Sequence, residues 1–362
     1  MAYLAVEVSG AGRHPGAHER SDARPDAILT APYHVELAEL AARAGADFLA
    51  LADSFAEPAD PLPTLDAVAI AARVAPVVPG IGLVPTVTTT HTEPFHISKA
   101  IATLDLVSSG RAGWQPTVSR TPYEAELFGR KPAAPTAELW REAADAVEVV
   151  VRLWDSWEDD AVIRDAATGR YVDRDKLHYI DFTGEFFSVK GPSITPRSPQ
   201  AHPLVVIREE PDSLAVAAAW ADVVRVAAPD LAAAHAARER VRDAVAGTGR
   251  NPDDVAVLLD VETLIGADAA RELDAMGPLE PSSVRVVDTA DALVDLIGTA
   301  VRDGAADGVT LVPLALPSGL QVIADEVAPR LAARGLANPA APGATLRERF
   351  GLARPANFFT KV

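Results

Sequence analysis

Residues 33–53 read YHVELAELAARAGADFLALAD and contain a complete helix-to-strand unit. Apolar residues recur at helical spacing over residues 33–44, and Gly45 follows as a helix stop. The predicted strand at 47–52 is apolar after its first residue, Asp47, as expected of a strand buried on both faces. Asp53 then ends the run with a carboxylate. This order predicts alternating helices and strands in the rest of the chain.

The alternation extends in both directions from this unit. We expect strands at residues 3–8, 47–52, 81–87, 111–114, 204–207, 223–227, 255–261 and 309–312, and helices at 33–44, 65–74, 96–106, 139–154, 231–246, 290–303 and 318–334. A further helix is expected between the fifth and sixth strands. Eight such β-α units favour a (β/α)8 TIM barrel over an open, doubly wound sheet.

Residues 155–201 interrupt the alternation between strands 4 and 5. Apolar and polar residues alternate over 179–189 around Gly184, which predicts a hairpin, and four prolines from Pro192 to Pro203 predict an extended connector. A loop this long in a compact domain usually serves a site or an interface. We therefore expect one barrel domain over residues 1–362 with an insertion segment at 155–201, either a functional loop or a dimer arm.

Composition excludes several classes of protein. The 362 residues carry a formal charge of −18, which would repel nucleic acid and anionic membranes. They include no cysteine, which excludes disulfides, thiolate metal sites and a cysteine nucleophile. No run of 18 or more residues lacks a charge or a proline, and no basic region precedes the apolar residues of MAYLAVEVSG, so we expect a cytoplasmic protein without a membrane partner. The sequence has no HExxH, GxSxG, GxxxxGK[ST] or GxGxxG motif and no acidic or histidine cluster with metal-ligand spacing.

Barrel enzymes place their chemistry at the carboxyl ends of the strands. Asp53 leaves an apolar strand and needs water, a cation or a hydrogen-bond donor, or else caps the next turn. Thr86 suits either a ligand contact or simply a strand, because threonine is β-branched. His91 is a candidate general base or an ordinary hydrogen-bonded histidine. Gln115 follows the fourth strand and is a second weak catalytic candidate.

Four segments resemble the bacterial-luciferase-like flavin monooxygenases, in the branch that contains nitrilotriacetate and dibenzothiophene sulfone monooxygenases. These are TEPFHISKAIATLDLVSSGRAGW (92–114), the segment from LWDSWEDD to TPRSPQ (153–200), GAADGVTLVPLALPSGL (304–320) and TLRERFGL (345–352). The resemblance covers nearly the whole chain. A longer stretch that the family usually carries near residues 270–287 is largely missing.

The resemblance implies a two-component enzyme that takes reduced FMN from a separate flavin reductase and uses O2 to oxygenate a small organic substrate. It also implies a homodimer or homotetramer. By position, the implied cofactor contacts are Asp53, Thr86, Gln115, Thr136, Trp140, Arg208 and Glu210. Gln115 stands where the family has asparagine, Thr136 where it has histidine, and Trp140 where it has tyrosine.

The loop after the fifth strand departs furthest from the family. Arg208, Glu209 and Glu210 replace small residues that hold the FMN phosphate in relatives. Two carboxylates there would repel a phosphate unless Arg208 offsets them, they point to solvent, or they bind a cationic substrate or an arginine from a partner subunit. The alternatives are therefore a flavin-site-degenerate, non-catalytic or partner-subunit homologue, or a barrel oxidoreductase that uses another cofactor such as F420.

Overall fold

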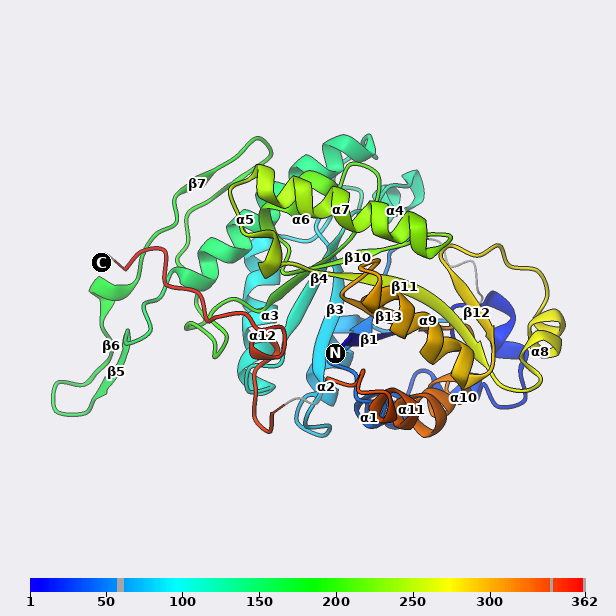
Figure 1. Cartoon of the computed structure of the whole chain (residues 1–362). Coiled ribbons are helices and arrows are strands. Elements are labelled where there is room, and N and C mark those ends of the chain that lie inside the picture. Colours follow the sequence, from blue (N-terminus) through cyan, green and yellow to red (C-terminus); the bar gives the residue numbers. More distant parts are fainter. Residues whose placement is uncertain (57–61, 339–340, 361–362) are drawn as a thin grey trace.

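The computed structural model describes residues 1–56, 62–338 and 341–360 and contains a closed parallel barrel (Figure 1). Its eight strands are β1 (Tyr3–Val8), β2 (Phe48–Leu51), β3 (Gly82–Thr88), β4 (Gly113–Thr117), β9 (Leu204–Arg208), β10 (Val223–Val226), β11 (Ala256–Ile265) and β13 (Gly308–Pro313). β1 pairs with both β2 and β13, and β10 pairs with both β9 and β11, so the ring closes. The predicted (β/α)8 TIM barrel is confirmed.

Helices surround the barrel. They are α1 (Ala31–Arg43), α2 (Ala67–Val74), α3 (Pro94–Val107), α4 (Pro122–Phe128), α5 (Thr136–Asp155), α6 (Leu214–Trp220), α7 (Leu231–Gly247), α8 (Ala269–Met276), α9 (Ala290–Arg302), α10 (Ser318–Val322), α11 (Ala328–Ala333) and α12 (Leu346–Arg349). Short 3-10 turns are η1 (Pro15–Glu19), η2 (Pro25–Ala27), η3 (Arg174–Lys176) and η4 (Pro252–Asp254). None of the helices in these ranges is long and apolar enough to cross a membrane.

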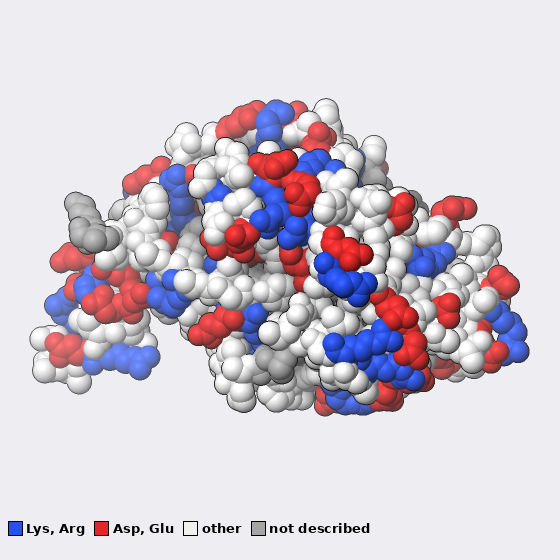
Figure 2. Space-filling view, in the orientation of Figure 1, with Lys and Arg blue, Asp and Glu red and all other residues white. Residues whose placement is uncertain are grey.

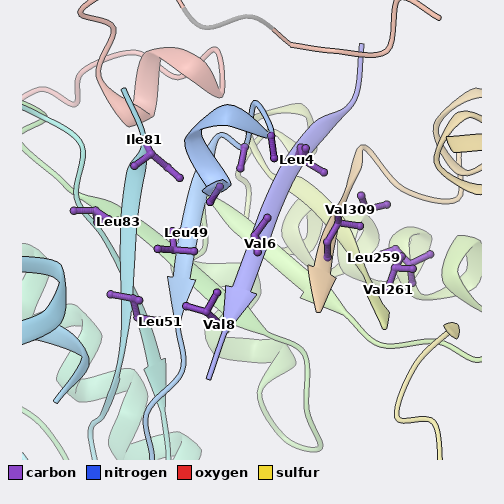
Figure 3. Packing of buried hydrophobic residues seen from close by; sticks show 14 of the residues in the cluster. Leu4, Val6, Val8, Leu49, Leu51, Ile81, Leu83, Leu259, Val261 and Val309 are labelled. Carbon is purple, nitrogen blue, oxygen red and sulfur yellow. The ribbon is translucent and has the colours of Figure 1, made fainter. Parts of the chain in front are cut away.

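Each strand buries both of its faces, as its nearly continuous apolar sequence requires. One face packs against the helices. Figure 3 shows this layer, in which Leu4, Val6 and Val8 of β1 lie near Leu49 and Leu51 of β2. The other face fills the barrel with a smaller cluster, whose members include Ala5, Phe48, Val84, Leu204, Val206, Val223 and Leu258.

The segment TLRERFGL closes the amino-terminal end of the barrel. Leu346 of α12 and Phe350, which directly follows α12, belong to the apolar cluster inside the barrel, and the Phe350 ring stacks on Tyr3 with 4.4 Å between ring centroids. Arg347 donates to the Asp222 carboxylate at 3.1 Å, which anchors the plug to the start of β10. This segment therefore acts as a plug at the amino-terminal end of the barrel, opposite the end where the strands finish.

The insertion lies between β4 and β9, as predicted, and projects from one side of the barrel (Figure 1). It contains two hairpins, β5 (Val162–Asp165) with β6 (Arg170–Val172) and β7 (Phe182–Thr183) with β8 (Ser188–Val189). The second is the hairpin predicted around Gly184. Arg197, which is almost fully buried, links the insertion to Asp155 at the end of α5.

Three features differ from the predicted elements. Neither α4 nor α8 was expected, nor was the strand β12 (Arg285–Asp288), in which only the two valines are apolar. β12 pairs with the last four residues of β11, in the region where the family's longer stretch is missing. The helix predicted at 318–334 is divided by a π turn, η5 (Ile323–Val327). Pro329 lacks the N–H that a regular helix needs there.

Charged side chains of both signs are interleaved on the face seen in Figure 2. On this face the acidic side chains are therefore mixed with arginines and lysines. Exposed ion pairs of this kind contribute little to stability individually.

Candidate active site at the carboxyl end of the barrel

The interior of the barrel changes from apolar to polar toward its open end. Side chains two residues apart on a strand point to the same face. Each polar residue of this layer therefore stands two positions after an interior residue that is apolar or glycine. The polar layer consists of Glu7 (β1), Thr86 (β3), Gln115 (β4), Arg208 (β9), Arg225 (β10) and Asp260 (β11). Six different strands thus contribute to one connected network.

Arg225 is the centre of this polar layer and is fully buried. Its guanidinium donates to Asp260 Oδ1 at 2.9 Å, to Glu7 Oε2 at 2.6 Å and to Gln115 Oε1 at 3.0 Å. Burial alone would raise the pKa of Glu7, but the charge of Arg225, with help from Arg208, outweighs burial and holds that pKa below its usual value. The floor of the site is therefore charged but internally balanced.

Gln115 joins this charged centre to β3. Its Oε1 accepts from Arg225, and its Nε2 donates to Thr86 Oγ1 at 3.1 Å. These two bonds fix which end of the amide faces which partner. Gln115 therefore acts as a bridge within the floor.

A cavity of about 230 Å³ lies above this floor. Its lining comprises Glu7, Ser9, Arg13, Ala52, Asp53, Thr86, Gln115, Pro116, Thr117, Trp140, Arg208 and Glu210. The structure thus brings together six predicted site residues, Asp53, Thr86, Gln115, Trp140, Arg208 and Glu210. Thr136 starts α5 one turn before Trp140 and is not among the lining residues.

Asp53 lies in the cavity wall and also caps the adjoining backbone. Its carboxylate accepts from the N–H of Ser54 at 2.8 Å and from the N–H of Ala67, the first residue of α2, at 2.9 Å. Burial raises the pKa of Asp53, and these two hydrogen bonds only partly oppose the shift. The capping interpretation is confirmed. A carboxylate has about four acceptor positions, so capacity for a ligand remains.

The two glutamates of the Arg208–Glu210 loop are each paired within the chain. Glu209 accepts from Arg240 of α7 at 3.0 Å, and Glu210 pairs with Arg120, which follows β4. Arg208 lies 3.2 Å from Asp260 Oδ2. The glutamates therefore neither point freely to solvent nor present unopposed charge to the cavity. The arginines that the sequence left to a partner subunit come from this same chain.

Trp140 brings a polar group that has no partner in the part of the chain that the structure describes. Its side chain is 2% exposed, and its buried Nε1–H makes no hydrogen bond there. A buried donor of this kind normally finds an acceptor. Since Trp140 lines the cavity, a ligand in the cavity is one source of such an acceptor.

His91 lies outside the lining of this cavity. Its ring stacks on Phe128 with centroids 4.6 Å apart. Burial, together with the charge of Lys131, lowers the pKa of His91 and favours the neutral ring. No contact connects His91 with the polar layer among the described residues, so a role as general base stays a prediction.

Glu7, Arg225 and Asp260 were not predicted as site residues. Each is a charged residue inside a mainly apolar strand, in the sequences YLAVEV, VVRV and AVLLDVETLI, and the third of these also contains Glu262 and Thr263. A charge at such a position is costly unless it is paired, and this could have marked all three. No cluster of three potential metal ligands occurs in the described ranges.

Comparison with known proteins identifies the family. A profile described as luciferase-like monooxygenase matches residues 8–294. N-acetyl-S-(2-succino)cysteine monooxygenase of Bacillus subtilis is 30% identical, with 99% of this chain and 98% of that protein aligned. Nitrilotriacetate monooxygenase component A of Aminobacter aminovorans is also 30% identical, with 97% and 96% aligned.

The fold agrees with that of solved members. EDTA monooxygenase from Chelativorans sp. BNC1 superimposes with a TM-score of 0.88 at 24% identity and covers 98% of both chains. The first alignment spans 432 positions against 362 residues here, so the relative contains segments that this chain lacks. The chain therefore belongs to the luciferase-like monooxygenase family.

Proposed function

We propose that this chain is the oxygenating component of a two-component monooxygenase that uses reduced FMN and O2 to oxidise a small organic substrate. The proposal rests mainly on one observation, the convergence of Asp53, Thr86, Gln115, Trp140, Arg208 and Glu210 on a single cavity at the barrel mouth. Family membership and the names of the aligned monooxygenases support it.

The cavity suits the ring part of a flavin. It combines the unpartnered Nε1–H of Trp140 with acceptor capacity at Asp53, and a flavin ring carries both acceptors and an N–H donor. Its volume of about 230 Å³ lies below the range of roughly 300–1,000 Å³ common for small-molecule sites. We therefore expect the cavity to hold the ring and leave the phosphate near the mouth.

Charge at the mouth is compatible with a phosphate. Arg13, which is exposed, and Glu210, which pairs with Arg120, both line the cavity, and they follow β1 and β9 on opposite sides of the ring. Arg13 has no ion pair among the described residues, although its charge acts on Glu7. A phosphate would find Arg13 available on one side, or would gain Arg120 on the other side by displacing Glu210.

The residues of the site have distinct proposed roles. Asp53 would hold the ring by accepting a hydrogen bond, and Trp140 would donate one. The Arg225 network would keep the floor rigid, because Gln115 and Thr86 are already tied to it. When bound, reduced flavin supplies the activation of O2, and the chain supplies binding, orientation and electrostatics.

A separate flavin reductase and a homodimer or homotetramer form part of the proposal. The word "component" in the name of the nitrilotriacetate relative supports the first. Oxygen is the second substrate in this scheme. The division into one domain of residues 1–362 with the 155–201 insertion is retained as a proposal as well.

Anaerobic calorimetric titration with reduced FMN tests the cofactor. Micromolar binding is expected. Glu210→Gln should tighten binding at least about fivefold, because one charge pair near 4 Å is worth about 1 kcal/mol even in water. Glu209→Gln is the matched control, since Glu209 pairs with Arg240 and does not line the cavity, and its affinity should stay within about twofold. Absence of binding at several hundred micromolar would remove the monooxygenase proposal.

One observation favours a second candidate function. Both polar atoms of the Gln115 side chain are hydrogen-bonded within the polar layer, and Arg208 contacts Asp260. Fewer polar groups are therefore free to bind a ligand than the family pattern implies. A non-catalytic or partner-subunit homologue would fit that arrangement. Binding of F420 in place of FMN in the same titration would instead favour the other-cofactor alternative.

A further inference from the structure

A second cavity adjoins the barrel mouth on the side of β3, α2 and α3. It holds about 240 Å³ and shares Asp53 and Thr86 with the first cavity. Its lining comprises Asp53, Ser54, Phe55, Asp66, Val68, Thr86, Val87, Thr88, Thr92, His96, Ile97, Ala100 and Ile101. Because two residues belong to both walls, a molecule held here lies next to the proposed flavin ring.

The long wall of this second cavity is apolar. Ile97, Ala100 and Ile101 come from one face of α3, and Val87 and Val68 face them from β3 and α2. Such a wall stabilises a hydrocarbon or aromatic body in proportion to the apolar area that it covers. A purely polar ligand would gain nothing from this wall.

Charge in the second cavity is of one sign. Asp66 caps α2 through a 2.7 Å bond from the N–H of Ala69, and Asp53 lies in the shared wall. None of the described lining residues is lysine or arginine, and His96 is the one lining group that could become cationic. A carboxylate placed here would meet two acidic side chains without a permanent cation to balance it.

We propose that this second cavity is the substrate site and that it takes an uncharged or cationic small organic molecule with an apolar body, not a polycarboxylate. The inference rests on the proposed function, since it places the substrate beside the flavin. It separates this chain from the aligned relative named for nitrilotriacetate, a polycarboxylate. A neutral compound such as the dibenzothiophene sulfone of another relative's name belongs to the proposed class.

A matched series of probes tests the class of ligand. We would titrate the full chain, without flavin, with 3-phenylpropan-1-amine, 3-phenylpropan-1-ol and 3-phenylpropanoate and follow binding by calorimetry. The amine and the alcohol should bind at least tenfold more tightly than the carboxylate. Equal or tighter binding of the carboxylate, or no binding of any of the three, would overturn the proposal.

Two pairs of variants test the location. Ala100→Trp should fill the cavity and weaken the alcohol at least tenfold, whereas Lys99→Trp, at an exposed position outside the lining, should leave it within twofold. Asp66→Asn should reduce the discrimination against the carboxylate at least threefold. Asp230→Asn is its control, because Asp230 caps α7 in the same way but does not line the cavity. Unchanged probe binding in both Ala100→Trp and Asp66→Asn would contradict the proposed site.

Reduced-FMN titration of the same variants keeps the two proposals apart. Ala100→Trp should leave FMN affinity within about threefold, because Ala100 does not line the first cavity. Loss of probe binding with intact FMN binding supports the substrate site. Intact FMN binding with no probe selectivity overturns the substrate class alone, and loss of FMN binding in the wild type overturns the proposed function.

Discussion

Replacement of Arg225 by methionine is the sharpest test of the charged floor. Arg225 is fully buried and hydrogen-bonded to Glu7, Asp260 and Gln115. Its removal leaves two carboxylates in the barrel without their main partner. Breaking a buried ion pair in this way costs about 3–5 kcal/mol, against a total stability of roughly 5–15 kcal/mol for a typical domain.

Urea unfolding at pH 7 would measure the effect. We expect Arg225→Met to lose about 3–5 kcal/mol. Arg302→Met, which breaks the exposed pair with Asp303, should lose about 1 kcal/mol or less. A value for Arg225→Met within about 1 kcal/mol of the wild type would refute the role assigned to the network.

The pH dependence of this difference gives an independent check. In the wild type Arg225 keeps the pKa of Glu7 low, so the folded state favours the ionised form. In Arg225→Met, burial opposed only by the weaker effects of Arg208 and Arg13 should raise that pKa instead, and protonation of Glu7 then relieves the penalty. The gap between variant and wild type should therefore narrow as the pH falls from 7 toward 4. A triple variant with Glu7→Gln and Asp260→Asn added should recover much of the lost stability at pH 7.

Three further predictions concern other residues. Burial raises the pKa of Asp47 to about 7, so the stability that this residue contributes is complete below its unfolded pKa near 3.8 and is lost as the pH rises through 7. Asp47→Asn should therefore flatten the dependence of stability on pH between pH 5 and 8, as measured by thermal unfolding. An unchanged slope would contradict this prediction. Asp53→Ala should weaken reduced FMN in anaerobic calorimetry, because both a wall acceptor and the cap on Ala67 are removed, and unchanged affinity would exclude Asp53 as a contact. Phe350→Ala removes a buried ring from the amino-terminal plug and should lower the free energy of unfolding in urea by about 3–5 kcal/mol. The same change at the exposed Phe358 should lower it far less. Similar losses for the two variants would argue against the plug.

Local patterns in the sequence were sufficient for the architecture. Apolar runs of strand length, helical spacing and glycine stops are properties of neighbouring residues, and they predicted all eight barrel strands and the interruption at 155–201. They failed where the apolar signal was weak or where a proline altered a helix. Only the two valines of β12 are apolar, and the π turn at η5 lies just before Pro329.

The candidate site was only partly accessible to the same reasoning. Asp53, Thr86 and Gln115 were found because they end strands, and the barrel geometry places strand ends together. Glu7, Arg225 and Asp260 were not predicted, because the partners of each lie on other strands across the barrel. Their pairing is what makes a charge at these positions tolerable.

Sequence alone therefore determined the order of strands and helices, the barrel they form and the edge at which the site lies. Only the tertiary structure decided which charges meet. Glu7 and Arg225 are 218 residues apart yet share a hydrogen bond, and Glu209 and Glu210 turn to different arginines although they are adjacent. Periodicity acts over a few residues, whereas ion pairs depend on distance in space, which the closure of the barrel sets.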